Sequence, residues 1–122
     1  MKKELVQKLQ QEFPSYFRNL YGDPKDSCLA FGLECNDGWF DIIWKVCLDI
    51  RATGKDKEFF FTQIKEKFGG LRLYCNYAHS DVWDIIDAAE EESYKVCENC
   101  GSRDQVTSEG SWITTLCGEC RK

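Results

Sequence analysis

The sequence predicts an α+β fold in which helices pack on a β-hairpin or small antiparallel sheet, with a cysteine-rich ribbon at the C-terminal end. Three observations lead to this prediction. Apolar residues recur every three or four positions in three segments, which is the period of a buried helix face. Around Gly69-Gly70 they alternate with polar residues, as in a strand, and the last quarter of the chain holds two Cys-x-x-Cys pairs. With 122 residues and 43% hydrophobic content, the chain can form one packed domain.

The first helix is expected over residues 2–13. Leu5, Leu9 and Phe13 lie four residues apart and would share one face. Pro14 ends the helix, because proline lacks an N–H and clashes with the preceding turn. A short aromatic continuation follows, made of Tyr16, Phe17, Leu20 and Tyr21.

A second, buried helix is expected over residues 39–50, after a turn and candidate cap at 36–38. Its apolar residues fall on one helical stripe: Trp39, Ile43, Val46, Cys47 and Ile50. From Phe59 the period changes to that of a hairpin. Ile64, Glu66 and Phe68 would share one face of its first strand, with Gln63, Lys65 and Lys67 on the other. In the second strand Leu71, Leu73 and Cys75 alternate with Arg72, Tyr74 and Asn76.

Ser80 or Asp81 can cap a third helix, which would run directly into Cys97. Its expected core positions are Val82, Ile86, Ala89, Ser93 and Val96. Because no linker separates this helix from the cysteines, we expect an α+β body over residues 1–96 and a ribbon over 97–122 that together form one structural unit.

Cys97, Cys100, Cys117 and Cys120 have the spacing of a tetrahedral zinc site. Each Cys-x-x-Cys pair supplies two thiolates from one tight turn. Four thiolates close the coordination shell, whereas a catalytic zinc keeps one position open for water or substrate. We therefore expect a structural Zn²⁺. Two disulfides, a redox-active Cys-x-x-Cys pair and an iron centre with the same four ligands remain alternatives.

Between the pairs, short strands are expected at 105–107 and 112–116, with a turn at 108–111, which together make a zinc ribbon. Gly101 follows the first pair, at a position that commonly needs a positive φ, and we expect a related role for Gly118.

Several strings of the sequence resemble a set of small zinc-ribbon proteins encoded by phages and prophages. They are Glu34-Cys35-Asn36-Asp37-Gly38-Trp39, the run from Gln63 to Tyr74 with Lys-Glu-Lys-Phe-Gly-Gly-Leu-Arg in its middle, Cys97-x-x-Cys100-Gly101, and Trp112-x-x-Thr115-Leu116-Cys117-x-x-Cys120. The resemblance covers residues 30–120. It implies a phage or prophage setting and a zinc-ribbon end, and no particular reaction.

Charge and the N-terminal sequence limit the classes of function. The net charge is −5, and four thiolates with one Zn²⁺ would bring it to about −7, which is the opposite sign from a general nucleic-acid binder. The first residues contain no apolar stretch long enough for a signal peptide or a membrane span. We expect a protein of the bacterial cytoplasm, where cysteines stay reduced.

No catalytic set is recognisable. His79, the single histidine, is expected to be a capping or surface residue. Cys47 and Cys75 are expected to be small buried hydrophobic residues. Cys28 and Cys35 lack metal spacing, and a reactive role or a second site for them stays open.

Two polar surfaces are candidate partner-binding faces. Lys65, Lys67 and Arg72 belong to a locally basic hairpin, and Glu90, Glu91 and Glu92 to an acidic helix, although ordinary solvated surfaces would show the same patterns. Our first hypothesis is a non-enzymatic phage or prophage accessory protein that binds a host protein, such as a defence component, with inhibition as one outcome. The second is a nucleic-acid-binding zinc-ribbon regulator. The third is an enzyme or redox protein that uses Cys28 or Cys35.

Overall fold

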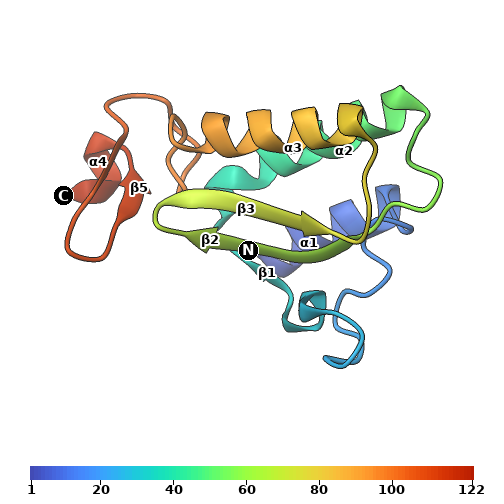
Figure 1. Ribbon diagram of the computed structural model, residues 1–122. Coiled ribbons are helices and arrows are strands. Elements are labelled where there is room, and N and C mark those ends of the chain that lie inside the picture. Colours follow the sequence, from blue (N-terminus) through green and yellow to red (C-terminus); the bar gives the residue numbers. More distant parts are fainter.

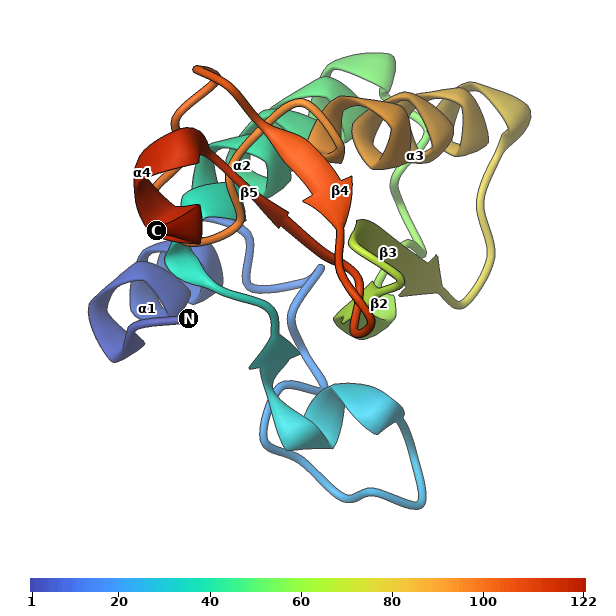
Figure 2. The same ribbon diagram turned by 90° about the vertical axis from the view of Figure 1, so that its left-hand side faces the viewer.

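The computed structural model describes residues 1–122 and confirms the α+β prediction (Figure 1). A small sheet carries helices on one face, and the C-terminal segment lies at one end of both (Figures 1 and 2). The helices of the body are α1 (Lys3–Glu12), α2 (Phe40–Thr53) and α3 (Ser80–Ser93), with single turns η1 (Cys28–Phe31) and η2 (Asp37–Trp39). The strands of the body are β1 (Leu33–Glu34), β2 (Phe61–Lys67) and β3 (Gly70–Cys75).

The sheet has the order β1-β2-β3 and is mixed rather than purely antiparallel. Strands β2 and β3 form the predicted hairpin, with Ile64 opposite Leu73. Strand β1 adds a parallel edge in which Leu33 lies opposite Ile64. The connection from β1 to β2 runs through α2, as a parallel pair requires. The sequence did not predict β1, because two residues are too few to show an alternating pattern.

Helices α2 and α3 lie side by side over the sheet and run in opposite directions (Figure 1). At one end, Lys55 after α2 forms an ion pair of 2.5 Å with Asp81 at the start of α3. At the other end, the Gly38 N–H before α2 donates to the Glu98 carbonyl after α3 at 2.7 Å. The two helices therefore form a layer whose far end adjoins the C-terminal ribbon.

The predicted stripe of α2 is confirmed. All of its expected core residues are buried: Trp39, Ile43, Val46, Cys47 and Ile50. Trp39 lies in η2, one residue before the helix begins, and Gly54 ends the helix in the left-handed conformation. The expected core residues of α3 and the following turn are also buried.

Two helix details differ from the predictions. In the first helix, Leu9 and Phe13 are buried as predicted, but Leu5 is only half-buried and the neighbouring Val6 is buried instead. The cap of α3 is His79 rather than Ser80 or Asp81. Its Nδ1 accepts the Asp81 N–H at 3.2 Å, because His79 is the last residue with extended backbone before the helix.

The hairpin also differs in two places. Its first strand begins at Phe61 rather than Phe59, with a register shift between Phe61 and Gln63, and Phe59 packs edge-on against Tyr16 instead. Phe68 does not share a face with Ile64 and Glu66. It occupies the hairpin turn with φ 53° and is 68% exposed, because the strand has already ended at Lys67.

The ribbon consists of β4 (Thr107–Glu109), β5 (Thr114–Leu116) and α4 (Gly118–Arg121) (Figure 2). Its first strand lies later than the expected 105–107, whereas the second covers the last three residues of the expected 112–116. Gln105 has φ 51° and belongs to a turn, and the chain reverses after Glu109. Gly118 lies in α4 without a positive φ, so the role expected for it was wrong, whereas Gly101 has φ 82° as predicted.

The hydrophobic core belongs to the body. One cluster joins buried residues from Val6 to Val96, and no residue of 97–122 is part of it. The buried residues of the ribbon are Cys97, Glu98, Thr115 and Cys117. The ribbon thus has no apolar core to hold it together. No helix of the structure is both long and apolar enough to span a membrane.

Candidate metal centre

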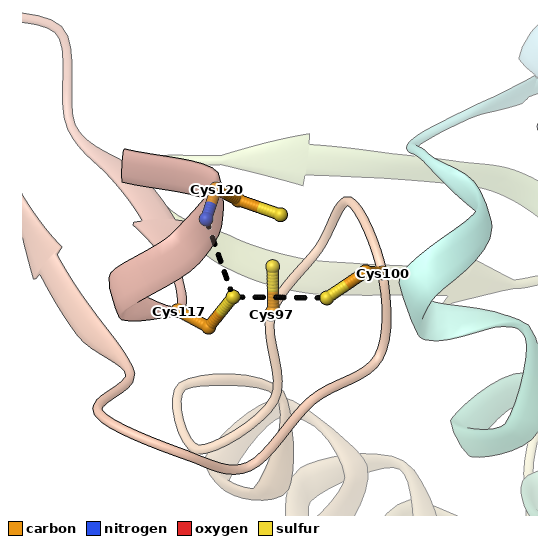
Figure 3. A group of neighbouring side chains, drawn as sticks. All are labelled: Cys97, Cys100, Cys117 and Cys120. Atoms are coloured by element: carbon orange, nitrogen blue, oxygen red, sulfur yellow. Dashed lines mark hydrogen bonds between the residues drawn. The ribbon is translucent and has the colours of Figure 1, made fainter. Parts of the chain in front are cut away.

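The four ribbon cysteines form one cluster in which the side chains point toward a common centre (Figure 3). All four Sγ atoms lie within 4.8 Å of one another, and those of Cys100 and Cys117 are 3.7 Å apart. A tetrahedral site with Zn–S bonds of about 2.3 Å places sulfurs about 3.8 Å apart. The cluster therefore has the four donor atoms that a metal ion needs, and their spacing is close to that of a tetrahedral site.

Local structure explains why the sulfurs converge. Cys97 and Cys100 lie on a tight turn that the Gly101 N–H closes by donating to the Cys97 carbonyl at 2.9 Å. Cys117 caps α4, where its Sγ accepts the Cys120 N–H at 3.5 Å (Figure 3). Asn99 reaches across the cluster and donates its amide to the Cys120 Sγ at 3.3 Å. N–H groups directed at the sulfurs stabilise thiolate charge.

The thiol groups are unequal. Burial raises the pKa of the Cys97 thiol, but N–H groups of Cys100, Cys117 and Asn99 outweigh burial and bring the pKa down to about 6. The Ser102 N–H lowers the pKa of Cys100, while contacts with Cys117 and the other cysteine sulfurs raise it to about 12. A thiolate thus forms easily at Cys97, while the Cys100 thiol keeps its proton. A bound cation would stabilise all four thiolates together.

The cluster is attached to the body at the start of α2. The Asn36 N–H donates to a carboxylate oxygen of Glu98 at 3.1 Å, and the Trp39 indole N–H donates to the Val96 carbonyl at 2.9 Å. Gly38 permits this contact. A Cβ at Gly38 would overlap the carbonyl oxygens of Cys97 and Glu98, which belong to rigid backbone.

A second attachment joins the ribbon to the hairpin turn. The buried Thr115 hydroxyl donates to the Gly69 carbonyl at 2.5 Å and lies 2.6 Å from the Ser108 hydroxyl. Next to it, the Tyr94 ring packs against Gly70, where a Cβ would lie 2.6 Å from the Tyr94 Cζ. Residues of 34–39, 63–74, 97–101 and 112–120 therefore meet at one place, the junction between body and ribbon.

The remaining cysteines lie outside the cluster. Cys35 and Cys47 are buried. Burial raises the pKa of Cys35 to about 12, and it raises the pKa of Cys47 as well. Cys75 is half-buried, and burial raises its pKa as well. Cys28 is exposed. The expectation of burial is confirmed fully for Cys47 and in part for Cys75.

The two candidate partner-binding faces contact each other. Lys65 and Arg72 are opposite residues of the hairpin, with Lys67 on the same face. Arg72 reaches α3 and forms an ion pair of 3.2 Å with Glu90. Glu92 is also paired, with Arg103 of the ribbon. Of the predicted acidic group, only Glu91 is exposed without an ion pair.

The sequence did not predict a groove of about 640 Å³ that lies between α2 and α3. We call it the α2–α3 groove. Its floor is made of Ile42, Val46, Ile85, Ala88, Ala89 and Val96, and its rim carries Asp41, Lys45, Asp49, Asp84, Glu92 and Arg103. The sequence contains one signal that could have predicted this groove: a second apolar stripe on α3, through Ile85 and Ala88. Gly101 and Arg103 of the ribbon line one end.

A smaller groove of about 460 Å³ lies between the hairpin turn and the ribbon. Phe68 and Trp112 line it, and Trp112 is 81% exposed. Lys65 and Lys67 stand beside these rings. Aromatic faces next to ammonium groups can stack on and pair with a ligand.

Comparison with protein-family models, with curated proteins and with solved structures gave no match to this chain. The fold and the cluster define an α+β protein with a tetracysteine centre that could hold a metal ion.

Proposed function

We propose that the protein is a zinc-stabilised, non-enzymatic accessory protein of a phage or prophage that binds a protein of its bacterial host. The observation that carries the proposal is the α2–α3 groove, which has an apolar floor and a largely acidic rim and is closed at one end by the ribbon. Metal, ribbon and groove would then act as one unit in the host cytoplasm. A component of host defence, which the protein would inhibit, is the kind of partner that fits the phage setting.

Zinc is the proposed ion because four cysteines offer it a complete tetrahedral shell. A closed shell leaves no position for water or substrate, so the metal would have a structural role. Its binding free energy would substitute for the apolar core that the ribbon lacks.

The charge of the groove favours a protein over a nucleic acid. Four carboxylates and two cations line the rim, so a phosphate backbone would be repelled. An apolar floor offers nothing to phosphate either. Burial of such a floor is the usual source of affinity between proteins.

The test is capture of the tagged, zinc-loaded protein from bacterial lysate, with and without nuclease. A host protein present at near-stoichiometric amounts after nuclease treatment, and missing with Cys117→Ser, is the expected result. If nothing is retained, or if everything retained disappears with nuclease, the proposal fails.

The second candidate, a nucleic-acid-binding regulator, is favoured by one observation: the groove between hairpin turn and ribbon combines exposed rings with lysines. Single-stranded DNA would stack on Trp112 and Phe68 there. The expected binding weakens steeply with salt and is lost with Trp112→Ala. Absence of binding at low salt would rule this candidate out.

A further inference from the structure

The α2–α3 groove has the length of a site for one short helix. Its walls run from Asp41 to Asp49 on α2 and from Asp84 to Glu92 on α3. Each wall therefore covers about 12 Å of helical rise. A third helix presents apolar residues at positions i, i+4 and i+7 over about 10 Å. The floor can thus accept two turns of such a helix.

The floor also allows a close approach. Ala88 is exposed and ends at Cβ, so it leaves space between the longer side chains of the walls. Ile85 beside it is half-buried, whereas Ile42 and Val46 beneath are buried. A helix seated here would pack against both α2 and α3 and bury the part of Ile85 that water still contacts.

The rim selects the charge of the occupant. Lys45 is neutralised by Asp49 at 2.6 Å, and Arg103 is paired with Glu92. Asp41 on one wall and Asp84 on the other form no ion pair. These two carboxylates, one on each wall of the groove, would face the two flanks of a bound helix. Lysine or arginine residues on those flanks would pair with them.

The walls favour a helix over an extended segment. Both walls are α-helices whose backbone N–H and C=O groups are used internally between their ends. An extended segment on the apolar floor would find no backbone partners for its own polar groups, which is costly. A helix brings its backbone hydrogen bonds with it.

We propose that the α2–α3 groove binds an amphipathic α-helix that carries apolar residues on one face and lysine or arginine on both flanks of that face. This inference rests on the proposed function and names the partner element for the same site. Because Gly101 and Arg103 close one end, metal removal would open the groove and weaken binding.

The probe is a 16-residue helical peptide with leucines at four heptad positions and lysines on both flanks, compared with the same peptide carrying glutamates in place of the lysines. Binding to the zinc-loaded full-length protein is followed by fluorescence anisotropy at physiological salt and by amide NMR shifts. We expect the lysine peptide to bind at least about tenfold more tightly and to shift the signals of Ile85 and Ala88.

Three variants test the location. Ala88→Arg fills the groove from an exposed helical position and should weaken binding about tenfold or more. Asp84→Lys should weaken it about threefold to tenfold, in line with the loss of an exposed ion pair and added repulsion. Asp87→Lys makes the same charge change on the same helix outside the groove, and should have less than a twofold effect.

Equal binding of the two peptides, equal effects of Asp84→Lys and Asp87→Lys, or shifts confined to the hairpin would each overturn the inference. So would a 20-nucleotide single-stranded DNA that shifts Ile85 and Ala88. If lysate capture succeeds while the lysine peptide fails, the proposed function stands and the assigned occupant is wrong. If the peptide results hold while capture fails, the groove inference stands and the host-protein function is rejected.

Discussion

The Gly38 N–H donates to the Glu98 carbonyl oxygen at 2.7 Å, across a gap of sixty residues in sequence. This bond joins the turn before α2 to the turn that carries Cys97 and Cys100. The Glu98 carboxylate accepts a second hydrogen bond from the Asn36 N–H, so one glutamate contacts two residues of the turn before α2. Its side chain is buried, and burial raises its pKa.

Gly38→Ala should destabilise the junction, because its Cβ would overlap backbone oxygens that cannot move independently. Overpacking of this kind costs about 1–3 kcal/mol in the free energy of unfolding. We expect a lower melting temperature together with weaker retention of zinc against a competing chelator, since the displaced backbone carries Cys97.

Gly54→Ala is the matched control. Gly54 has φ 68° and no neighbour near its Cβ position, so alanine there costs about 1 kcal/mol through backbone strain alone. Zinc retention should stay at the wild-type value. If Gly38→Ala retains zinc as well as Gly54→Ala does, the junction does not control the metal centre.

Cys117→Ser should release the metal and disorder the ribbon, because residues 97–122 contribute nothing to the apolar core. NMR signals of the ribbon should lose their dispersion while those of α2 and the hairpin remain. Cys28→Ser, at an exposed cysteine outside the cluster, should leave both unchanged. Unaltered melting of Cys117→Ser with one metal still bound would contradict the assignment.

The eight cysteines should differ in reactivity toward a thiol reagent at neutral pH. In the metal-bound protein we expect one fast thiol, Cys28. Cys35 and Cys47 are buried, Cys75 is half-buried, and burial raises the pKa of all three. A chelator should expose four more thiols. The fast reaction should vanish in Cys28→Ser. A fast Cys35 would revive the reactive role that the sequence left open.

The Lys55–Asp81 ion pair should respond to pH in a defined direction. Lys55 lowers the pKa of the Asp81 carboxyl below its ordinary 3.8, with a smaller contribution from His79. A lowered folded-state pKa means that the pair stabilises the protein above pH 3.8 and that this contribution is lost as pH falls through the folded-state pKa.

Lys55→Met should therefore raise the Asp81 pKa, measured by carboxyl ¹³C NMR titration. Lys57→Met is the control, because Lys57 is exposed and does not contact Asp81. An unchanged Asp81 pKa in Lys55→Met would show that the pair between the ends of α2 and α3 does not persist in solution.

Sequence patterns predicted those elements of the fold in which apolar residues repeat at a fixed spacing along the chain. The predicted apolar stripe of α2 is buried at every position, because a buried helix must repeat its apolar residues every three or four places. The cysteine spacing likewise placed the four sulfurs together, because a metal site needs them at fixed separations.

The junction could not be predicted in the same way. The segment 36–38 was interpreted as a turn and candidate cap. It does lie in a turn, but no side chain caps α2 there, and its contact with Glu98 joins residues far apart in sequence. The α2–α3 groove depends on how two helices pack, and Arg72 pairs with Glu90 only because α3 lies over β3. Tertiary contacts of this kind leave no periodic signal.

We propose that a four-thiolate zinc centre holds the ribbon on the body. Native mass spectrometry of the protein purified without added metal, combined with elemental analysis, is the test of this proposal. We expect one zinc per chain and eight reduced cysteines. A folded, metal-free chain with disulfides among Cys97, Cys100, Cys117 and Cys120, or one iron per chain in place of zinc, would contradict it.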